Sequence, residues 1–343
     1  GGAGAEGGAG GAGAEGGAGG AGAEGGAGGM ACTAAETDYP GDSWDACISD
    51  DGTYHLAGDN APSSIARIAS FETIADLLWR GGEAPDAMAF LNARMEYAID
   101  QGLDSRVARR YDAHLDRPAE GVNCRGETHG VEYPDYCVGP GKIQPLLNAA
   151  FADGQAGNAP WVNAAKVEAG LLWFIYVSTH KEAYSCKGAA KDCDSCWAYY
   201  GAGDTQDTAT GFAKYAQNLE PGTHARMFQA ILGVRCWRDQ DNAETAENTD
   251  LHQQVLGQLD RSLNRALAVI LIDRLNKFRS AEGDAKAAAW AFLKIMGPVI
   301  DRAARAINAD SADQMMTAWA SEDGAGVDAS ALVAGLNTVF PCP

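Results

Sequence analysis

The sequence predicts an all-α fold, an irregular multi-helix bundle with long disulfide-stapled loops behind a disordered Gly/Ala-rich tail. Hydrophobic residues after residue 62 recur at spacings of three and four, and no convincing period-two alternation is present. Between residues 161 and 340 the only prolines are Pro221 and Pro298. The longest apolar run, Ala169–Val177, has nine residues, too few to cross about 30 Å of hydrocarbon. It therefore predicts a buried helix at the centre of the bundle.

The tail, residues 1–29, consists only of Gly, Ala and three Glu, arranged as repeats of GGAGAEGGA. Such a segment cannot bury enough surface to offset its chain entropy, so a flexible tether is expected. Its composition resembles the stretch that follows the lipidated cysteine in many bacterial surface lipoproteins. That resemblance implies a lipid anchor upstream of residue 1. An engineered spacer before Met30 is the alternative.

The first half of the remaining chain predicts fewer helices than the second. Residues 30–62 are rich in Asp, Gly and Pro and should be irregular. A serine pair can cap a helix over 64–80 that ends at a glycine pair. A second helix is predicted from Pro85 to Gly102, and a short polar helix over 105–115. Residues 116–142 contain three prolines and predict a long loop.

The second half is strongly helical. The predicted helices cover about 160–186, 222–240, 249–279, 285–308, 311–321 and 328–338, with a break in the fourth at Gly297-Pro298. We expect one domain over 30–343, which could be subdivided into 30–142 and 143–343 near the long loop.

Composition and motifs narrow the function classes. The 46% hydrophobic content excludes a disordered chain, and the net charge of −20 argues against nucleic acid and anionic membrane surfaces as partners. The sequence contains no nucleophile elbow, phosphate loop or His-Glu-x-x-His motif, and outside the tail no nucleotide-binding glycine motif. No catalytic residue and no cofactor is therefore predicted.

Nine cysteines, several in short loops, indicate a disulfide framework and hence an oxidising compartment. The expected bridges are Cys32 with Cys47, Cys124 with Cys137, and Cys186 with Cys193 or Cys196. Cys236 is either a buried free thiol or the partner of the cysteine left over from that trio, and Cys342 is unassigned. Zinc held by the cysteines at 186, 193, 196 and 236 is a weaker alternative.

The sequence contains only weak candidates for metal-ligating residues. His180 and Glu182 lie near the end of the 160–186 helix, and His129 and Glu132 lie in the long loop. Imelysin-like proteins, exported helical bundles linked to iron uptake, carry Gly-x-His-x-x-Glu. This chain has Gly126-x-x-His129-x-x-Glu132, with one residue too many after the glycine, so no site residue is transferred and no metal site is predicted. Imelysin-like metal handling is kept as an alternative function.

Polar side chains on core-facing stripes are the candidates for a ligand pocket. These are His252, Asp260 and Arg274 on the 249–279 helix, Arg235 on the 222–240 helix and Glu72 on the 64–80 helix. A buried charge must be paired or must line a cavity, so these residues form either a structural network or a polar pocket. Arg235 and Glu72 are the expected partners of Asp260 and Arg274.

Together these observations predict an exported, tethered, non-enzymatic helical protein that binds a partner or a small ligand at the bacterial cell surface. Its expected location is the periplasm or the cell surface, with the outer membrane as the site of tethering. The alternatives are imelysin-like iron handling and an enzyme with an unrecognised acidic site.

Overall fold

The computed structural model describes residues 47, 49, 51–58, 60–125, 127–240 and 249–342. The chain divides into two units, Gly1–Met30 and Ala31–Pro343, and all described residues belong to the second. Their regular secondary structure is entirely helical, without a strand, which confirms the predicted all-α class. The tether predicted over residues 1–29 lies outside the described residues.

The first half contains short helices around a long connection. They are α1 (Ser64–Leu78), α2 (Ala87–Tyr97), α3 (Leu103–Val107), α4 (Glu127–Glu132), the π-helical turn η1 (Gly139–Ile143) and α5 (Gln144–Gln155). The polar helix predicted over 105–115 is wrong, because α3 begins earlier and ends at Val107. A longer helix would place Arg106 beside Arg109 and Arg110 on one face, where like charges repel. The predicted 116–142 loop in fact includes α4 and part of η1.

The second half matches the predicted helices more closely. Its elements are α6 (Pro160–Ser185), α7 (Ala190–Tyr200), α8 (Gly211–Leu219), α9 (Pro221–Gln240), α10 (Thr249–Ser280), α11 (Gly283–Met296), η2 (Gly297–Ile300), α12 (Asp301–Ile307), α13 (Ala309–Trp319) and α14 (Ala329–Val339). The predicted break at Gly297-Pro298 is confirmed as the 3₁₀ turn η2. Over both halves, four short helices are not among the predicted ones: α4, α5, α7 and α8. Helices of this length depend on tertiary packing more than on local propensity.

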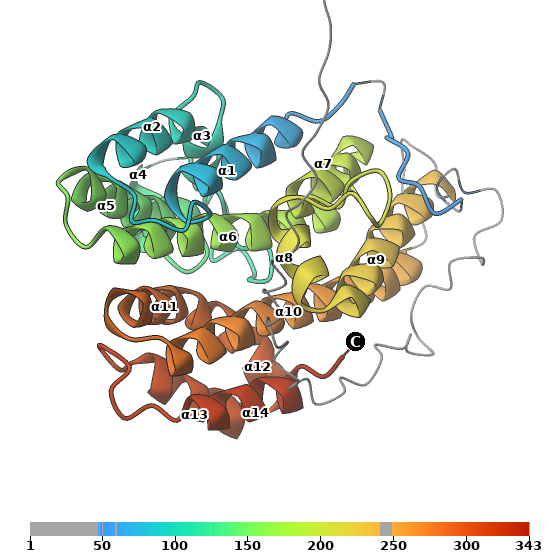
Figure 1. Ribbon diagram of the computed structural model, residues 1–343. Coiled ribbons are helices and arrows are strands. Elements are labelled where there is room, and N and C mark those ends of the chain that lie inside the picture. The colour runs from blue at the N-terminus through green and yellow to red at the C-terminus, as the bar shows by residue number, and fades with distance from the viewer. Residues whose placement is uncertain are drawn as a thin grey trace, which may run out of the picture. The chain divides into compact units, whose positions relative to one another are not determined.

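The central element is α6, which packs against α5, α7, α10 and α11. In Figure 1 it runs between α1 and α2 on one side and α10 and α11 on the other. Leu172 and Ile175 are both 0% exposed, which confirms that this segment is buried. One hydrophobic cluster extends from Cys47 to Phe340 and includes residues from both sides of the 142/143 boundary. In the part of the chain that is described, no helix has the length and hydropathy needed to span a membrane.

Two of the three predicted disulfides are formed. Cys124–Cys137 and Cys186–Cys193 are bonded. The predicted Cys32–Cys47 bridge is wrong, because Cys47 is bonded to Cys236, 189 residues away. This bond also excludes both predicted states of Cys236. Cys342 is disulfide-bonded as well, and Cys196 is a buried free thiol.

Candidate functional site

A pocket of about 500 Å³ lies where the chain after α3 meets the last part of α6. Six cationic side chains line it: Arg106, Arg109, Arg110, Arg117, Arg125 and Lys181. Among the described residues that line it, Glu182 is the only acidic one. These cations belong to a chain with just 26 lysines and arginines and a net charge of −20. We call this cavity the basic pocket.

Close backbone packing fixes the positions of Arg106 and Arg110 in the basic pocket. Arg106 is in the last turn of α3, and Arg110 follows in a tight turn whose amide donates to the Val107 carbonyl at 3.1 Å. The Gly139 amide of η1 donates to the Arg110 carbonyl at 2.9 Å. A Cβ at Gly139 would lie 1.9 Å from the Val107 oxygen, so only glycine permits this approach.

The outer wall of the basic pocket is closed by the Cys124–Cys137 disulfide. Around it lies a second small hydrophobic cluster, in which Tyr111 stacks on Tyr136 with ring centroids 5.3 Å apart. The disulfide and the stacked rings restrain the loop that carries Arg117 and Arg125. The wall is thus held by contacts that do not involve its cations.

Arg110 and Glu182 form the buried ion pair of the pocket. Arg110 Nη1 donates to Glu182 Oε1 at 2.9 Å, and these side chains are only 7% and 9% exposed. Lys181 Nζ lies 2.9 Å from the other carboxylate oxygen. Burial alone would raise the pKa of Glu182, but the charges of Arg110 and Lys181 hold it below its ordinary value. One carboxylate is therefore shared between two cations.

The remaining positive charge is not compensated. The Nε atoms of Arg106, Arg109 and Arg110 are buried without a hydrogen-bond partner in the described part of the protein. Burial and neighbouring arginines lower the pKa values of Arg106 and Arg109. An anion in the pocket would offset the mutual repulsion of these guanidinium groups.

An adjoining pocket of about 480 Å³ has mixed charge. The two pockets share Arg106, Lys181 and Glu182, and the second adds the cations Arg67 and Lys191 and the carboxylates Asp192 and Asp194. The excess of positive charge is therefore largest in the basic pocket.

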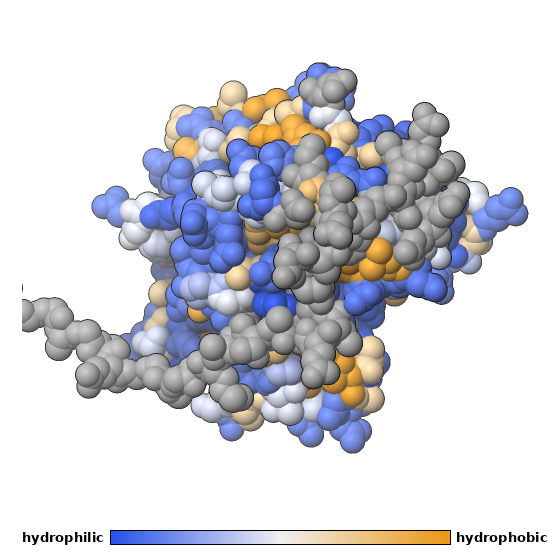
Figure 2. Space-filling model, turned by 90° about the vertical axis from the view of Figure 1, so that its right-hand side faces the viewer, coloured by the Kyte–Doolittle hydropathy of each residue, from blue (hydrophilic) through white to orange (hydrophobic). Residues whose placement is uncertain are grey.

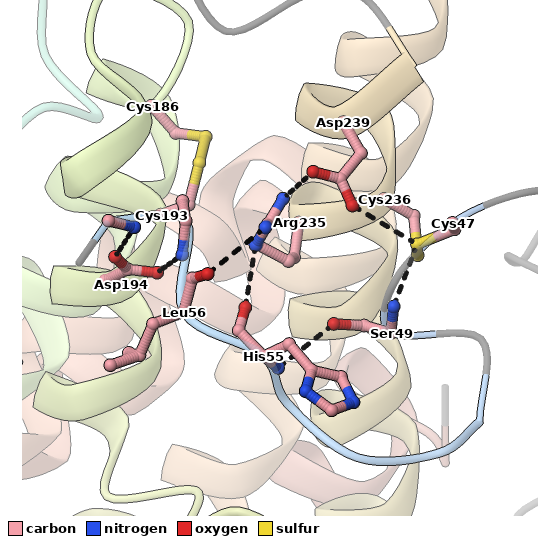
Figure 3. Close-up of polar contacts among 12 residues, drawn as sticks. Cys47, Ser49, His55, Leu56, Cys186, Cys193, Asp194, Arg235, Cys236 and Asp239 are labelled. Carbon is pink, nitrogen blue, oxygen red and sulfur yellow. Dashed lines mark hydrogen bonds and ion pairs between the residues drawn. A yellow bond between two sulfur atoms is a disulfide. The ribbon is translucent and has the colours of Figure 1, made fainter.

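Arg235, a predicted pocket residue, instead holds the N-terminal segment against the bundle (Figure 3). Its guanidinium donates to the carbonyls of His55 at 2.8 Å and Leu56 at 3.4 Å and pairs with Asp239. Asp194 of α7 accepts from the amides of the next two residues of the segment, at 2.8 and 3.2 Å. Together with the Cys47–Cys236 disulfide, these contacts form what we call the Arg235 clamp.

Glu72 and Arg274 also have structural partners, though not the predicted ones. Glu72 pairs with Arg80 at 2.6 Å and accepts from the Gly211 amide at 2.8 Å. Arg274 pairs with Glu168 of α6 at 2.5 Å. Glu168 meets Arg274 through the rotation of α6 relative to α10, which a stripe on a single helix does not specify. His252 is buried and stacks on Trp237 with ring centroids 4.0 Å apart.

Asp260 belongs to a separate cluster with two histidines, and not to a pair with Arg235 or Glu72. His114 Nε2 lies 2.9 Å from Asp260 Oδ1, and His114 Nδ1 lies 2.7 Å from Asp112 Oδ1. The His180 ring stacks on His114 at 3.5 Å, with its Nε2 atom 4.0 Å from Asp260. We call His114, His180 and Asp260 the histidine cluster.

Burial and mutual charge shift the pKa values in the histidine cluster. Burial and the adjacent His114 lower the pKa of His180 to about 3. The His114 hydrogen bond and nearby cations outweigh burial and lower the pKa of Asp260 to about 2. Hydrogen bonds to Asp112 and Asp260 raise the pKa of His114 despite its burial.

The four metal candidates named from the sequence do not meet at one place. His180 joins Asp260, whereas Glu182 lies in the basic pocket. His129 Nδ1 contacts the backbone of Asn123, and Glu132 is exposed. The grouping of metal-ligand side chains found among the described residues is the histidine cluster.

Sequence reasoning missed His114 and the cations of the basic pocket. Five arginines do fall between residues 106 and 125, and that density was the available signal. The net charge of −20 concealed it, because a net charge averages over the whole chain. His114 lies among those arginines in an irregular segment, where no periodicity assigns it to a face.

On the face shown in Figure 2, hydrophilic residues cover most of the described surface and hydrophobic ones form small patches.

Comparisons with protein-family models, curated proteins and solved structures found no match for this chain.

Proposed function

We propose that this protein is an exported, tethered, non-enzymatic binding protein whose basic pocket takes a small, multiply charged oxyanion of the phosphate class. The observation that carries the proposal is the set of six cations around one shared carboxylate among the described residues that line the pocket.

The arginines favour an oxyanion ligand. A guanidinium presents planar pairs of donors that match phosphate and carboxylate oxygens, and such charge-assisted hydrogen bonds are stronger than neutral ones. The pocket volume of about 500 Å³ lies within the range of small-molecule sites. Several arginines in one cavity suit a ligand with more charge than one carboxylate carries.

The charge of the whole protein favours a small ligand over a polymer. At physiological ionic strength a charge is screened beyond about 8 Å. A small anion within the pocket is therefore governed by the local cations. A nucleic acid would extend beyond the pocket and meet the surface of a chain with net charge −20.

The pocket is better suited to binding than to turnover. Glu182, the one carboxylate among the lining residues that the structure describes, is paired with Arg110 and Lys181. A carboxylate with a lowered pKa and two cationic partners is a poor general base. This argues for the non-enzymatic function over the enzymatic alternative.

The disulfides support the proposed export. Bridges persist in oxidising compartments and are rare in the cytosol, and three are formed between described cysteines. The composition of residues 1–29 supports a tether. We therefore place the binding function in the periplasm or at the cell surface.

Calorimetric titration with pyrophosphate tests the proposal, with inorganic phosphate, sulfate and citrate as comparison ligands. We expect pyrophosphate to bind more tightly than phosphate or citrate, with an affinity that falls as salt rises. Arg109→Gln should weaken binding by about 10- to 100-fold, since charge-assisted hydrogen bonds contribute about 1.5–3 kcal/mol.

Arg279→Gln is the matched control, because Arg279 is an exposed cation in the last turn of α10. It removes the same charge from the chain and should leave pyrophosphate affinity unchanged. Equal effects of the two substitutions, or no binding of any of the four anions, would overturn the proposal.

A further inference from the structure

The histidine cluster brings together three potential metal-ligand side chains from three separate parts of the chain. His114 comes from the segment after α3, His180 from α6 and Asp260 from α10. Their candidate ligand atoms all lie within 4.8 Å of one another. The two histidine side chains are 3% and 11% exposed, and Asp260 is 30% exposed.

His114 has the surroundings of an oriented metal ligand. Its Nδ1 atom contacts the Asp112 carboxylate at 2.7 Å, while its Nε2 atom faces Asp260 at 2.9 Å. A carboxylate behind one ring nitrogen fixes the ring and directs the other nitrogen to the metal in many histidine sites. Asp112 and Asp260 thus bracket the ring on opposite edges.

His180 has no evident structural role that uses its polar atoms. Its Nδ1 atom is buried and lacks a hydrogen-bond partner in the described part of the chain. Its Nε2 atom lies 4.0 Å from Asp260, beyond hydrogen-bond distance. A buried imidazole that only stacks on another ring would be replaceable by an apolar side chain, whereas a bound cation would use its nitrogen lone pair.

From this geometry we infer that His114, His180 and Asp260 form a mononuclear site for a divalent first-row transition metal of the zinc type, with Asp112 as the outer carboxylate. Two imidazoles and one carboxylate suit Zn²⁺, Co²⁺ or Ni²⁺ better than Mg²⁺ or Ca²⁺, which prefer oxygen ligands. Three protein ligands leave a position for water or another small ligand.

A metal ion at the cluster would displace one neighbouring cation. Arg302 is the competing cation, with its Nη2 atom 3.7 Å from Asp260 Oδ1. Its side chain is 34% exposed, so it can turn toward solvent when a metal ion replaces it. Tyr176, whose ring stacks on His114, donates to Asn264 at 2.6 Å.

Titration of the full chain with Zn²⁺, after EDTA treatment and its removal, tests this site. We expect one Zn²⁺ per chain by calorimetry, an increase in melting temperature, and a visible absorption band when Co²⁺ is used instead. His180→Gln should lower Zn²⁺ affinity by at least about 100-fold, since a side chain that binds the metal directly matters at least as much as the outer hydrogen-bonding groups, whose loss costs about 10- to 100-fold.

His224→Gln is the control, because His224 is buried on α9 but contacts Tyr200 and the Gln206 carbonyl instead of the cluster. It should bind Zn²⁺ like the wild type. Asp260→Asn provides a second test with the side-chain shape retained, and circular dichroism in EDTA checks that each variant is folded.

Failure of the wild type to bind Zn²⁺ would overturn the inference. So would folded His180→Gln and Asp260→Asn variants that bind Zn²⁺ with wild-type affinity and give the same Co²⁺ spectrum. Pyrophosphate binding is measured separately in metal-free protein, so the basic pocket and the metal site can fail independently.

Discussion

Arg235 and the arginines of the basic pocket are buried or half-buried cations in the same bundle, but their guanidinium groups have different surroundings. Arg235 donates to two backbone carbonyls and to Asp239. Arg106 and Arg109 instead have neighbouring arginines, which lower their pKa values. The comparison separates a cation whose charge is paired within the fold from cations that are opposed by like charges, and position on a helix stripe does not make this distinction.

The largest effect should come from the disulfide of the Arg235 clamp. Replacing both Cys47 and Cys236 by Ser should lower the free energy of unfolding by about 3–5 kcal/mol, because the bridge closes a very long loop. Urea unfolding without reductant measures this change. Pyrophosphate affinity of the folded variant should stay at the wild-type value. A loss below about 1 kcal/mol would mean that the clamp is held by its polar contacts alone.

Removing the cation of the clamp should have the next largest effect. We expect Arg235→Met to cost about 2–4 kcal/mol of stability, since it leaves two backbone carbonyls and Asp239 without their donor. The same unfolding experiment measures it, with calorimetry as the second readout. If pyrophosphate affinity fell along with stability, the division between clamp and pocket would be wrong.

Arg106→Gln should behave in the opposite way. The substitution relieves repulsion from Arg67 and Arg109, so the free energy of unfolding should stay constant or rise by up to about 1 kcal/mol. Pyrophosphate affinity should fall as it does for Arg109→Gln. A destabilised variant with intact affinity would show that Arg106 is a structural cation like Arg235.

The smallest expected effect is on how stability changes when the pH is lowered. The folded pKa of Glu182 lies below its unfolded value, so its contribution to stability is present above the unfolded pKa of about 4.3 and is lost as pH falls through the folded pKa. Glu182→Gln should therefore lose stability less steeply below about pH 4. Chemical denaturation across this pH range measures the slope, and identical slopes for both proteins would contradict the ion pair.

The fold could be predicted from the sequence where the residues of a single helix were enough to define that helix. The apolar run around Leu172 and Ile175 predicted the central helix, and Pro298 predicted the break after α11. The helices α5, α7 and α8 were missed because each is short and depends on its neighbours. The Cys47–Cys236 bridge was missed because it joins segments that only the folded chain brings together.

For the two sites, the sequence identified some of the residues but not which of them meet. Asp260 and His180 were both named from the sequence, but as members of different candidate sets. Their meeting depends on the relative rotation of α6 and α10, which neither helix specifies. His114 completes the histidine cluster from an irregular segment, and the arginines of the basic pocket converge through the packing of Gly139 on the end of α3.

The Cys47–Cys236 bridge has a mechanical consequence. A pull on the chain directly before Cys47 reaches the described body at a covalent bond to α9. The load then passes into a 20-residue helix and bypasses the segment with His55 and Leu56, whose hydrogen bonds to Arg235 would otherwise open one at a time. The bond therefore acts as a mechanical anchor, which keeps tension at Cys47 from pulling that segment off the bundle.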